Sequence, residues 1–308
     1  MLLAGCLTLA GCAASDRSPA ESETAFNARA LQVADLWQAA LTGASGTWRA
    51  GFVPLQELTI PPGGLTDELR VASAAGWFRT NVALPARVPP AGLIAYPDGT
   101  TASVPLIGAQ AAYERLAKGE PPCEPPAAPA PTNPANSSDP SGSVGVPAPH
   151  TCAQLTVTGA ELGSTTIRTS RGAATVPAWL FTVAELPSPV ARVAVADTEI
   201  SPVPHPSVPP MDAELLVGLA SASRLTGTQD LELTYTVDIG ACEDAPSGLV
   251  YQTPDVVVVA ALRGARTSRE CVALLKRQPV TVRLDAPLGA AVVVDAVFGA
   301  PLQGGVSS

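Results

Sequence analysis

Leu231-Glu232-Leu233-Thr234-Tyr235-Thr236-Val237-Asp238 is the stretch of sequence that decides the fold of the C-terminal third of the chain. Apolar and polar side chains alternate along it, and a period of two places the apolar ones on a single face of a strand. Val280, Val282 and Leu284 alternate in the same way, whereas residues 256–262 are apolar throughout, as expected for a strand covered on both faces. The sequence therefore predicts a small all-β, sandwich-like domain over residues 212–302.

An α+β domain is expected upstream, over residues 23–200. Its first element is one amphipathic helix that ends at Gly43, because apolar residues recur there at spacings of four and three, with Asn27, Arg29, Gln32 and Asp35 between them. The apolar residues of this stripe are Phe26, Ala30, Val33, Trp37 and Leu41. Strands are predicted over residues 49–60, 77–84, 155–158, 165–169, 174–183 and 190–196, a hairpin over 93–106, and short helices over 65–75 and 109–118, the second capped by Gly119.

Two proline-rich segments divide this pattern. Residues 120–150 lack any periodicity and are expected to form a disordered loop inside the first domain. Residues 201–211 contain five prolines and are predicted to be a semi-rigid linker between the domains. The segment 215–224, which follows the linker, fits either a helix or a strand, and we expect a strand because a Thr-Gly-Thr turn leads from it into the strand at Leu231.

Composition limits the possible partners. The 18 Lys and Arg residues face 27 Asp and Glu residues, so the formal net charge of −9 disfavours binding to nucleic acid. One basic cluster departs from this balance. It favours a solvated hairpin loop, with contact to an anionic headgroup or cell-wall polymer as the alternative. The cluster consists of Arg263, Arg266, Arg269, Lys276, Arg277 and Arg283.

The N-terminus carries the strongest motif. A short apolar stretch ends at Leu9-Ala10-Gly11-Cys12, after which the sequence turns polar. This pattern resembles the bacterial lipobox. The resemblance implies that residues 1–12 are a lipoprotein signal peptide, that Cys12 carries the lipid, and that residues 13–22 tether the fold to the outer face of the cytoplasmic membrane.

A rival box, Leu3-Ala4-Gly5-Cys6, leaves almost no apolar region before its cysteine, so Cys12 is preferred. No Lys or Arg precedes either box, which departs from the usual positive start of a signal and leaves the true start of translation open.

A second resemblance agrees with this location. Residues 165–172 with 174–179, and residues 283–289 with 294–296, resemble uncharacterised lipoproteins of high-GC Gram-positive bacteria. That resemblance implies the same compartment and no particular chemistry.

Four cysteines follow the lipobox, namely Cys123, Cys152, Cys242 and Cys271. An even number of cysteines in an exported chain indicates two disulfides, with three possible connectivities. The cysteines form two local pairs with the same spacing, so we predict Cys123–Cys152 and Cys242–Cys271. A zinc site is the alternative, but the chain lacks a Cys-x-x-Cys motif.

No catalytic motif stands out. His150 and His205 lie in proline-flanked segments, and no motif indicates a cofactor. Two carboxylates would suffice for glycoside hydrolysis, and such a pair could come from Glu57, Asp67, Glu68, Asp98, Asp238 and Asp255. The tryptophans that could stack on sugars, Trp37, Trp48, Trp77 and Trp179, lie in core-like patterns.

The sequence therefore favours a lipid-anchored extracytoplasmic envelope protein. We expect a non-enzymatic binding or structural module for an unknown protein or cell-wall ligand. The alternative is a carboxylate-dependent hydrolase acting on an envelope or extracellular glycan.

Overall fold

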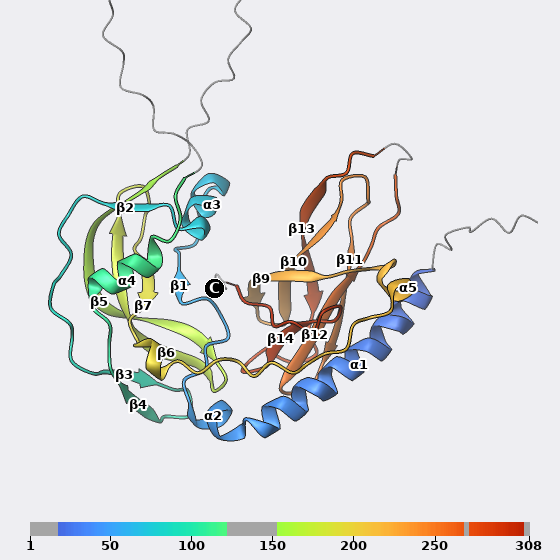
Figure 1. Cartoon of the computed structure of the whole chain (residues 1–308), viewed down its shortest axis with the longest axis horizontal. Coiled ribbons are helices and arrows are strands. Elements are labelled where there is room, and N and C mark those ends of the chain that lie inside the picture. Colours follow the sequence, from blue (N-terminus) through green and yellow to red (C-terminus); the bar gives the residue numbers. More distant parts are fainter. Residues whose placement is uncertain (1–17, 122–152, 268–270, 305–308) are drawn as a thin grey trace, which may run out of the picture. The chain divides into compact units, whose positions relative to one another are not determined.

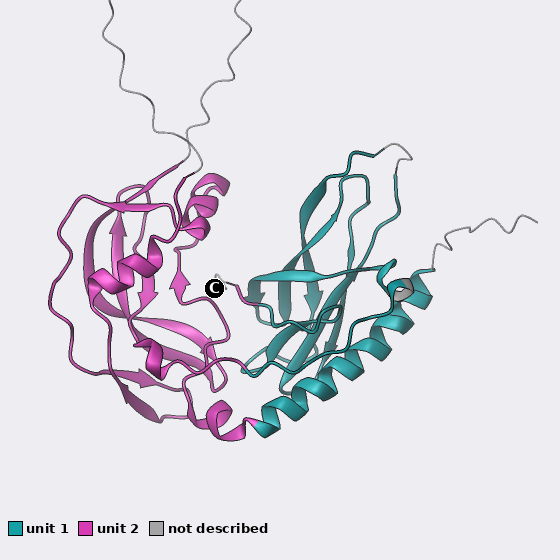
Figure 2. Cartoon of the chain, in the orientation of Figure 1, with its two compact units in different colours: residues 1–43, 204–302 teal, residues 44–203, 303–308 magenta. Residues whose placement is uncertain are grey.

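The computed structural model describes residues 18–121, 153–267 and 271–304, and its fold is rich in β-strands, as the sequence predicts. The chain forms two compact units (Figure 2). Unit 1 comprises residues 1–43 and 204–302, and unit 2 comprises residues 44–203 and 303–308. The expected division into domains differs from this one, because the N-terminal helix belongs to the same unit as the C-terminal strands.

Unit 1 contains two sheets (Figure 1). In the first, β10 (Glu232–Gly240) pairs antiparallel with both β9 (Ala222–Gln229) and β13 (Leu275–Arg283). In the second, β12 (Val256–Leu262) is central. It pairs antiparallel with β11 (Ser247–Gln252) and β8 (Leu219–Ala220), and parallel with β14 (Val292–Asp295).

The two sheets of unit 1 pack face to face. The Tyr235 hydroxyl of β10 reaches across and donates a hydrogen bond to the Ala260 carbonyl oxygen of β12 at 2.5 Å. Gly248 of β11 lies so close to the opposite sheet that a Cβ atom there would overlap the side chains of Val280 and Val282. The alternating residues of β10 and β13 that are buried lie between the two sheets.

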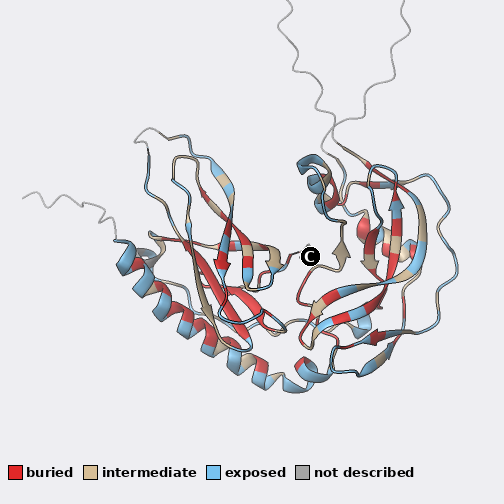
Figure 3. Cartoon of the chain, turned by 180° about the vertical axis from the view of Figure 1, so that it is seen from behind, coloured by how far each residue is buried: buried red, intermediate tan, exposed pale blue. Residues whose placement is uncertain are grey.

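The helix α1 (Pro19–Gly43) packs on β11 and β12. All five apolar residues of its predicted stripe are buried, and Figure 3 shows the buried positions recurring along one side of the helix. Residues 256–261 of β12 are fully buried because one face meets the other sheet and the other meets α1. The all-β expectation for residues 212–302 thus missed a helix supplied from the other end of the chain.

Helix α1 begins four residues earlier than the predicted tether allows. Glu21 accepts hydrogen bonds from the backbone N–H and the hydroxyl of Ser18, each at 2.9 Å, and Pro19 occupies the first helical position. A capping serine, a proline at the first position and a glutamate in the first turn together favour helix initiation at this point. The tether expected over residues 13–22 is therefore shorter, because residues 19–22 are helical.

The predicted linker does not act as a spacer along its whole length. Residues 204–211 form no helix or strand but belong to unit 1. The His205 ring lies 5.7 Å from the Trp37 ring, and the Pro209 carbonyl oxygen accepts a hydrogen bond from Arg29. The following segment, expected as a strand over 215–224, forms the short helix α5 (Ala213–Leu216), then β8 and the start of β9.

Unit 2 is built around the long hairpin of β5 (Leu155–Thr169) and β6 (Gly172–Val183). The sheet order is β1–β7–β6–β3–β4, and β5 pairs with β6 and with β2. The shorter strands are β1 (Thr59–Ile60), β2 (Phe78–Thr80), β3 (Gly92–Ala95), β4 (Thr101–Val104) and β7 (Val190–Val193). The helices are α2 (Ser45–Ala50), α3 (Asp67–Ala75) and α4 (Ala109–Leu116), with a 3₁₀ turn at Asp197–Glu199.

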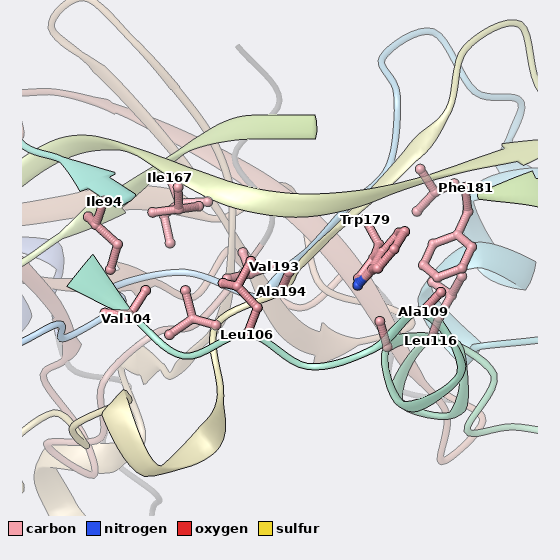
Figure 4. Close-up of a cluster of buried hydrophobic side chains, with 14 of the residues drawn as sticks. Ile94, Val104, Leu106, Ala109, Leu116, Ile167, Trp179, Phe181, Val193 and Ala194 are labelled. Carbon is pink, nitrogen blue, oxygen red and sulfur yellow. The ribbon is translucent and has the colours of Figure 1, made fainter. Parts of the chain in front are cut away.

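The core of unit 2 extends along its sheet from α4 to a group that includes Ile94, Val104 and Leu106 (Figure 4). Phe181 and Trp179 of β6 pack near Ala109 and Leu116 of α4, and the Trp179 indole N–H donates to the Ile107 carbonyl oxygen at 2.9 Å. The hydrogen bond satisfies the one polar group of a side chain that is only 3% exposed, so this tryptophan serves the core, as predicted.

Several predicted elements of unit 2 are wrong in detail. Residues 49–60 contain the end of α2 and only a two-residue strand, and 77–84 contain three strand residues. The strands predicted over 155–158 and 165–169 are one continuous strand. Gly119 is not the cap of α4, whose C-cap is Ala117; its N–H instead donates to the Gly76 carbonyl oxygen. Most of the predicted 120–150 loop lies outside the described residues.

Candidate functional site

Two hollows lie on unit 1. The larger, which we call the helix groove, has a volume of about 940 Å³ and runs between the first turns of α1 and the segment 210–212. Its polar lining comes from Glu21, Thr24, Arg29, Gln32 and Asp212, and its apolar lining consists of alanines of α1 with Pro210 and Met211. The lining of the groove is therefore mixed in character.

Arg29 ties the groove to the body of unit 1. Its Nε donates to the Ala296 carbonyl oxygen at 2.9 Å, and its Nη2 donates to those of Pro209 at 2.7 Å and Val297 at 3.0 Å. Burial lowers the pKa of Arg29, while the nearby Asp295 carboxylate acts in the opposite direction. The guanidinium thus links α1 to Pro209 and to residues 296–297. Arg29 therefore has a structural role, although the sequence pattern placed it among the polar positions of the helix.

Asp295, the last residue of β14, is a buried carboxyl group that is only 1% exposed. Its oxygens accept hydrogen bonds from the backbone N–H groups of Ala222 at 2.8 Å and Phe298 at 2.7 Å. Burial raises its pKa to about 6, although the hydrogen bonds oppose the shift. Such a pKa would suit a general acid, but Asp295 lines neither hollow and its oxygens face backbone amides.

The second hollow, of about 410 Å³, lies beside the Cys242–Cys271 disulfide. The structure confirms this predicted pair. We call the surrounding residues 240–244, 264–267 and 271–275 the stapled tip. Besides the disulfide, Ala241 N–H donates to the Leu274 carbonyl oxygen and Thr267 N–H donates to that of Cys242, at 2.9 Å and 2.8 Å.

The basic cluster is distributed over this tip and the strand that leaves it. Arg263 forms an ion pair with Glu243 at 3.2 Å, and Arg277 forms one with Asp238 at 3.1 Å. The Lys276 ammonium donates to the Glu243 carbonyl oxygen at 2.7 Å. Arg266 is exposed and lines the second hollow. Arg269 lies outside the described residues, and the cations of the cluster named here lie at a hairpin end and do not form a continuous stripe.

The six carboxylates considered for glycoside hydrolysis are dispersed and line neither hollow. In unit 2, Asp67 pairs with Arg70, and Asp98 lies in the turn between β3 and β4. Hydrogen bonds from Thr100 and then Arg171 lower the pKa of Asp98 to about 2, which suits a fixed anion and not a general acid. Asp238 and Asp255 belong to unit 1, on β10 and just before β12. No observation in the described chain favours a hydrolase.

Four of the remaining candidate residues lie outside the described parts of the chain, namely Cys12, Cys123, Cys152 and His150. Trp37, Trp48 and Trp179 are buried and Trp77 is half-buried against the core of unit 2, as their patterns predict. Among the residues that the structure describes, no three His, Cys, Asp or Glu side chains gather as a metal site would require. None of the described helices contains an apolar stretch of the length that crossing a bilayer requires.

Comparisons with family models, with curated proteins and with solved structures found no match to this chain.

Proposed function

We propose that this chain is a lipid-anchored envelope protein on the outer face of the cytoplasmic membrane, acting as a non-enzymatic binding or structural module. Cys12 carries the lipid in this proposal. The observation that supports it most is the short distance along the chain from the Leu-Ala-Gly-Cys box to a helix that is built into the body of unit 1.

The anchoring helix is well suited to hold a folded unit near a membrane. Arg29 and Trp37 of α1 donate hydrogen bonds to backbone oxygens of Ala296, Val297 and Gly299. A force on the N-terminus is therefore transmitted through α1 to residues 296–299, which follow the last strand of unit 1. The Cys242–Cys271 disulfide agrees with folding in an oxidising compartment outside the cytoplasm.

A binding or structural role accounts for the described surface better than catalysis does. The buried Asp295 carboxyl group, whose pKa is raised, faces backbone amides. The helix groove presents Glu21 and Asp212 beside Arg29, whose guanidinium already donates to carbonyl oxygens. We propose that the helix groove and the loops of unit 1 face a protein or polymer of the envelope. No nucleic acid or cofactor has a role in this proposal.

The experiment compares two cysteine variants of the full chain expressed in a bacterial host fed with an alkyne-labelled palmitate. Cys12→Ser should abolish both labelling and recovery in the membrane fraction, because the acylated thiol is lost. Cys6→Ser, which alters the rival box, is the matched control and should retain both. Loss of labelling in Cys6→Ser alone, or an unlabelled natural chain, would refute the proposal.

A further inference from the structure

The stapled tip exposes a group of apolar side chains. Val272, Leu274 and Leu275 are 64%, 65% and 75% exposed, and Ala273 between them is exposed as well. Among the described residues, the other exposed large apolar side chains stand singly in the sequence. Scattered apolar side chains are ordinary on a protein surface, but a contiguous exposed run indicates a contact with something apolar.

The covalent frame keeps these side chains outward. The disulfide joins Cys242 to Cys271 directly before the apolar run, and Gly240 pairs with Leu275, the last residue of the run. The hydrogen bond from Ala241 N–H to the Leu274 carbonyl oxygen fixes the backbone between these two points. The run therefore cannot fold back onto the sheet without breaking its own hairpin.

Basic side chains border the apolar run. Residues 263–277 contain five cations and one carboxylate, a net charge of +4, and the facing segment 238–244 contributes three carboxylates. These two segments, which extend past the stapled tip into the strands that carry it, thus have a net charge of +1 in a chain whose net charge is −9. Protein surfaces that enter the headgroup layer of a bilayer combine apolar side chains such as leucine and valine with arginine and lysine.

The start of α1 lies at the same end of unit 1 as this tip. Gly218 approaches α1 so closely that a Cβ atom on it would overlap the Ser22 hydroxyl. The Gly218 carbonyl oxygen accepts a hydrogen bond from Arg263 N–H at 3.0 Å, and the Arg263 guanidinium pairs with Glu243 of the tip. Contacts therefore run without a break from the first turns of α1 to the disulfide-bonded hairpin.

We propose that the stapled tip is a second membrane contact, in which Val272, Leu274 and Leu275 enter the interfacial layer of an anionic bilayer while Arg266, Lys276 and Arg277 meet its headgroups. The proposal rests on the lipid anchor for its setting, because six residues from Cys12 to Ser18 reach at most about 20 Å. The lipid would then hold this end of unit 1 close to the bilayer, where a weak apolar contact is favoured by high effective concentration. The contact would orient unit 1 on the membrane.

Residues 13–308 provide the test, because this chain lacks the lipidated cysteine and keeps every described residue. Its binding is measured by flotation with vesicles at millimolar lipid, made of phosphatidylglycerol and phosphatidylcholine in equal parts or of phosphatidylcholine alone. We expect binding about fivefold stronger to the anionic vesicles, as one net positive charge near the surface would give, and weaker binding in 0.5 M salt. Absence of binding to the anionic vesicles, or equal binding to both compositions, would overturn the proposal.

A pair of double variants locates the contact. Leu274→Ser/Leu275→Ser should weaken anionic-vesicle binding at least about tenfold, because two large apolar side chains leave the interface. Leu93→Ser/Leu162→Ser, which removes two exposed leucines from unit 2, should bind as the parent chain does. Thermal unfolding checks that both variants fold. If the tip variant does not fold, the binding of the parent chain to the two kinds of vesicle still tests the proposed membrane contact.

Self-association is the competing occupant of the tip. A concentration-dependent dimer that Leu274→Ser/Leu275→Ser abolishes, without vesicle binding by the parent chain, would assign the tip to a second copy of the chain and overturn the proposal. Because residues 13–308 carry no lipid, this result is independent of the Cys12→Ser comparison. Failure of the anchor and failure of the tip contact are therefore distinguishable.

Discussion

The guanidinium of Arg29 donates a hydrogen bond to the carbonyl oxygen of Val297, 268 positions away in the sequence. The same side chain reaches the carbonyl oxygens of Ala296 and Pro209. Three segments that are far apart in the sequence thus converge on one arginine, and the N-terminal helix becomes an integral part of the C-terminal unit.

Arg29→Ala should destabilise unit 1 strongly. The substitution leaves three carbonyl oxygens without the donor that they have in the parent chain. Because a buried unsatisfied group costs about 1–3 kcal/mol, we expect the free energy of unfolding to fall by roughly 3–5 kcal/mol. Urea denaturation monitored by circular dichroism measures this free energy. Gln32→Ala, which removes an exposed neighbour that accepts from Arg29, is the control and should cost less than about 0.5 kcal/mol. Equal effects of the two variants would contradict the role assigned to Arg29.

Asp295 should make the stability of unit 1 fall as the pH rises from about 4 to about 6. Its pKa in the folded chain is raised from 3.8 to about 6, so the folded state binds the proton more tightly than the unfolded state does. The group therefore favours folding while protonated, and about 3 kcal/mol of that advantage is lost once the pH exceeds the folded pKa.

Asp295→Asn isolates this effect, because the difference in unfolding free energy between parent and variant cancels the other titrating groups. The variant should be destabilised, since an amide N–H₂ would face a backbone N–H of Ala222 or Phe298. The parent-minus-variant difference should shrink by about 2 kcal/mol between pH 4 and pH 7. A difference that stays constant over this range would show that burial does not shift the pKa as described.

Gly248 and Gly227 form a matched pair of strand glycines in unit 1. Gly248→Ala should cost about 1–3 kcal/mol, because the added Cβ would overlap Val280 and Val282 of the facing sheet. Gly227→Ala meets only Thr234, at an ordinary contact distance of 3.7 Å, and should be neutral or slightly stabilising. The two melting temperatures give the comparison, and a tolerated Gly248→Ala would argue against the close packing of the two sheets.

The Cys242–Cys271 disulfide should contribute about 3–4 kcal/mol to stability, because it closes a loop of about 30 residues in the unfolded chain. The double variant Cys242→Ala/Cys271→Ala tests this value by denaturation under non-reducing conditions. Dithiothreitol should lower the stability of the parent chain and leave the double variant unchanged. A double variant as stable as the parent would contradict the expectation.

Local signals in the sequence located many elements but not their partners. The stripe from Phe26 to Leu41 predicts α1, and the alternation around Leu233 and Tyr235 predicts β10, because both depend on periodicity alone. The stripe does not reveal which strands cover it, since that contact joins opposite ends of the chain. The assignment of α1 to the first domain followed sequence order and was wrong for this reason.

Some of the missed features had a signal and others had none. Ser18-Pro19-Ala20-Glu21 is a helix-start pattern, so the early beginning of α1 could have been predicted from the sequence. Arg29 lies among polar positions of the helix, and Asp295 ends a run of three valines, so neither is marked as buried by its neighbours in sequence. Their burial depends on backbone groups contributed by distant segments, which only the fold brings together.

The lipid on Cys12 is the central claim, and the most direct measurement is the intact mass of the protein extracted from bacterial membranes, with fragmentation of its N-terminal peptide. We expect a mature chain that begins at Cys12 and carries a thioether-linked diacylglycerol. An unmodified Cys12, or a mature N-terminus at any other residue, would contradict it.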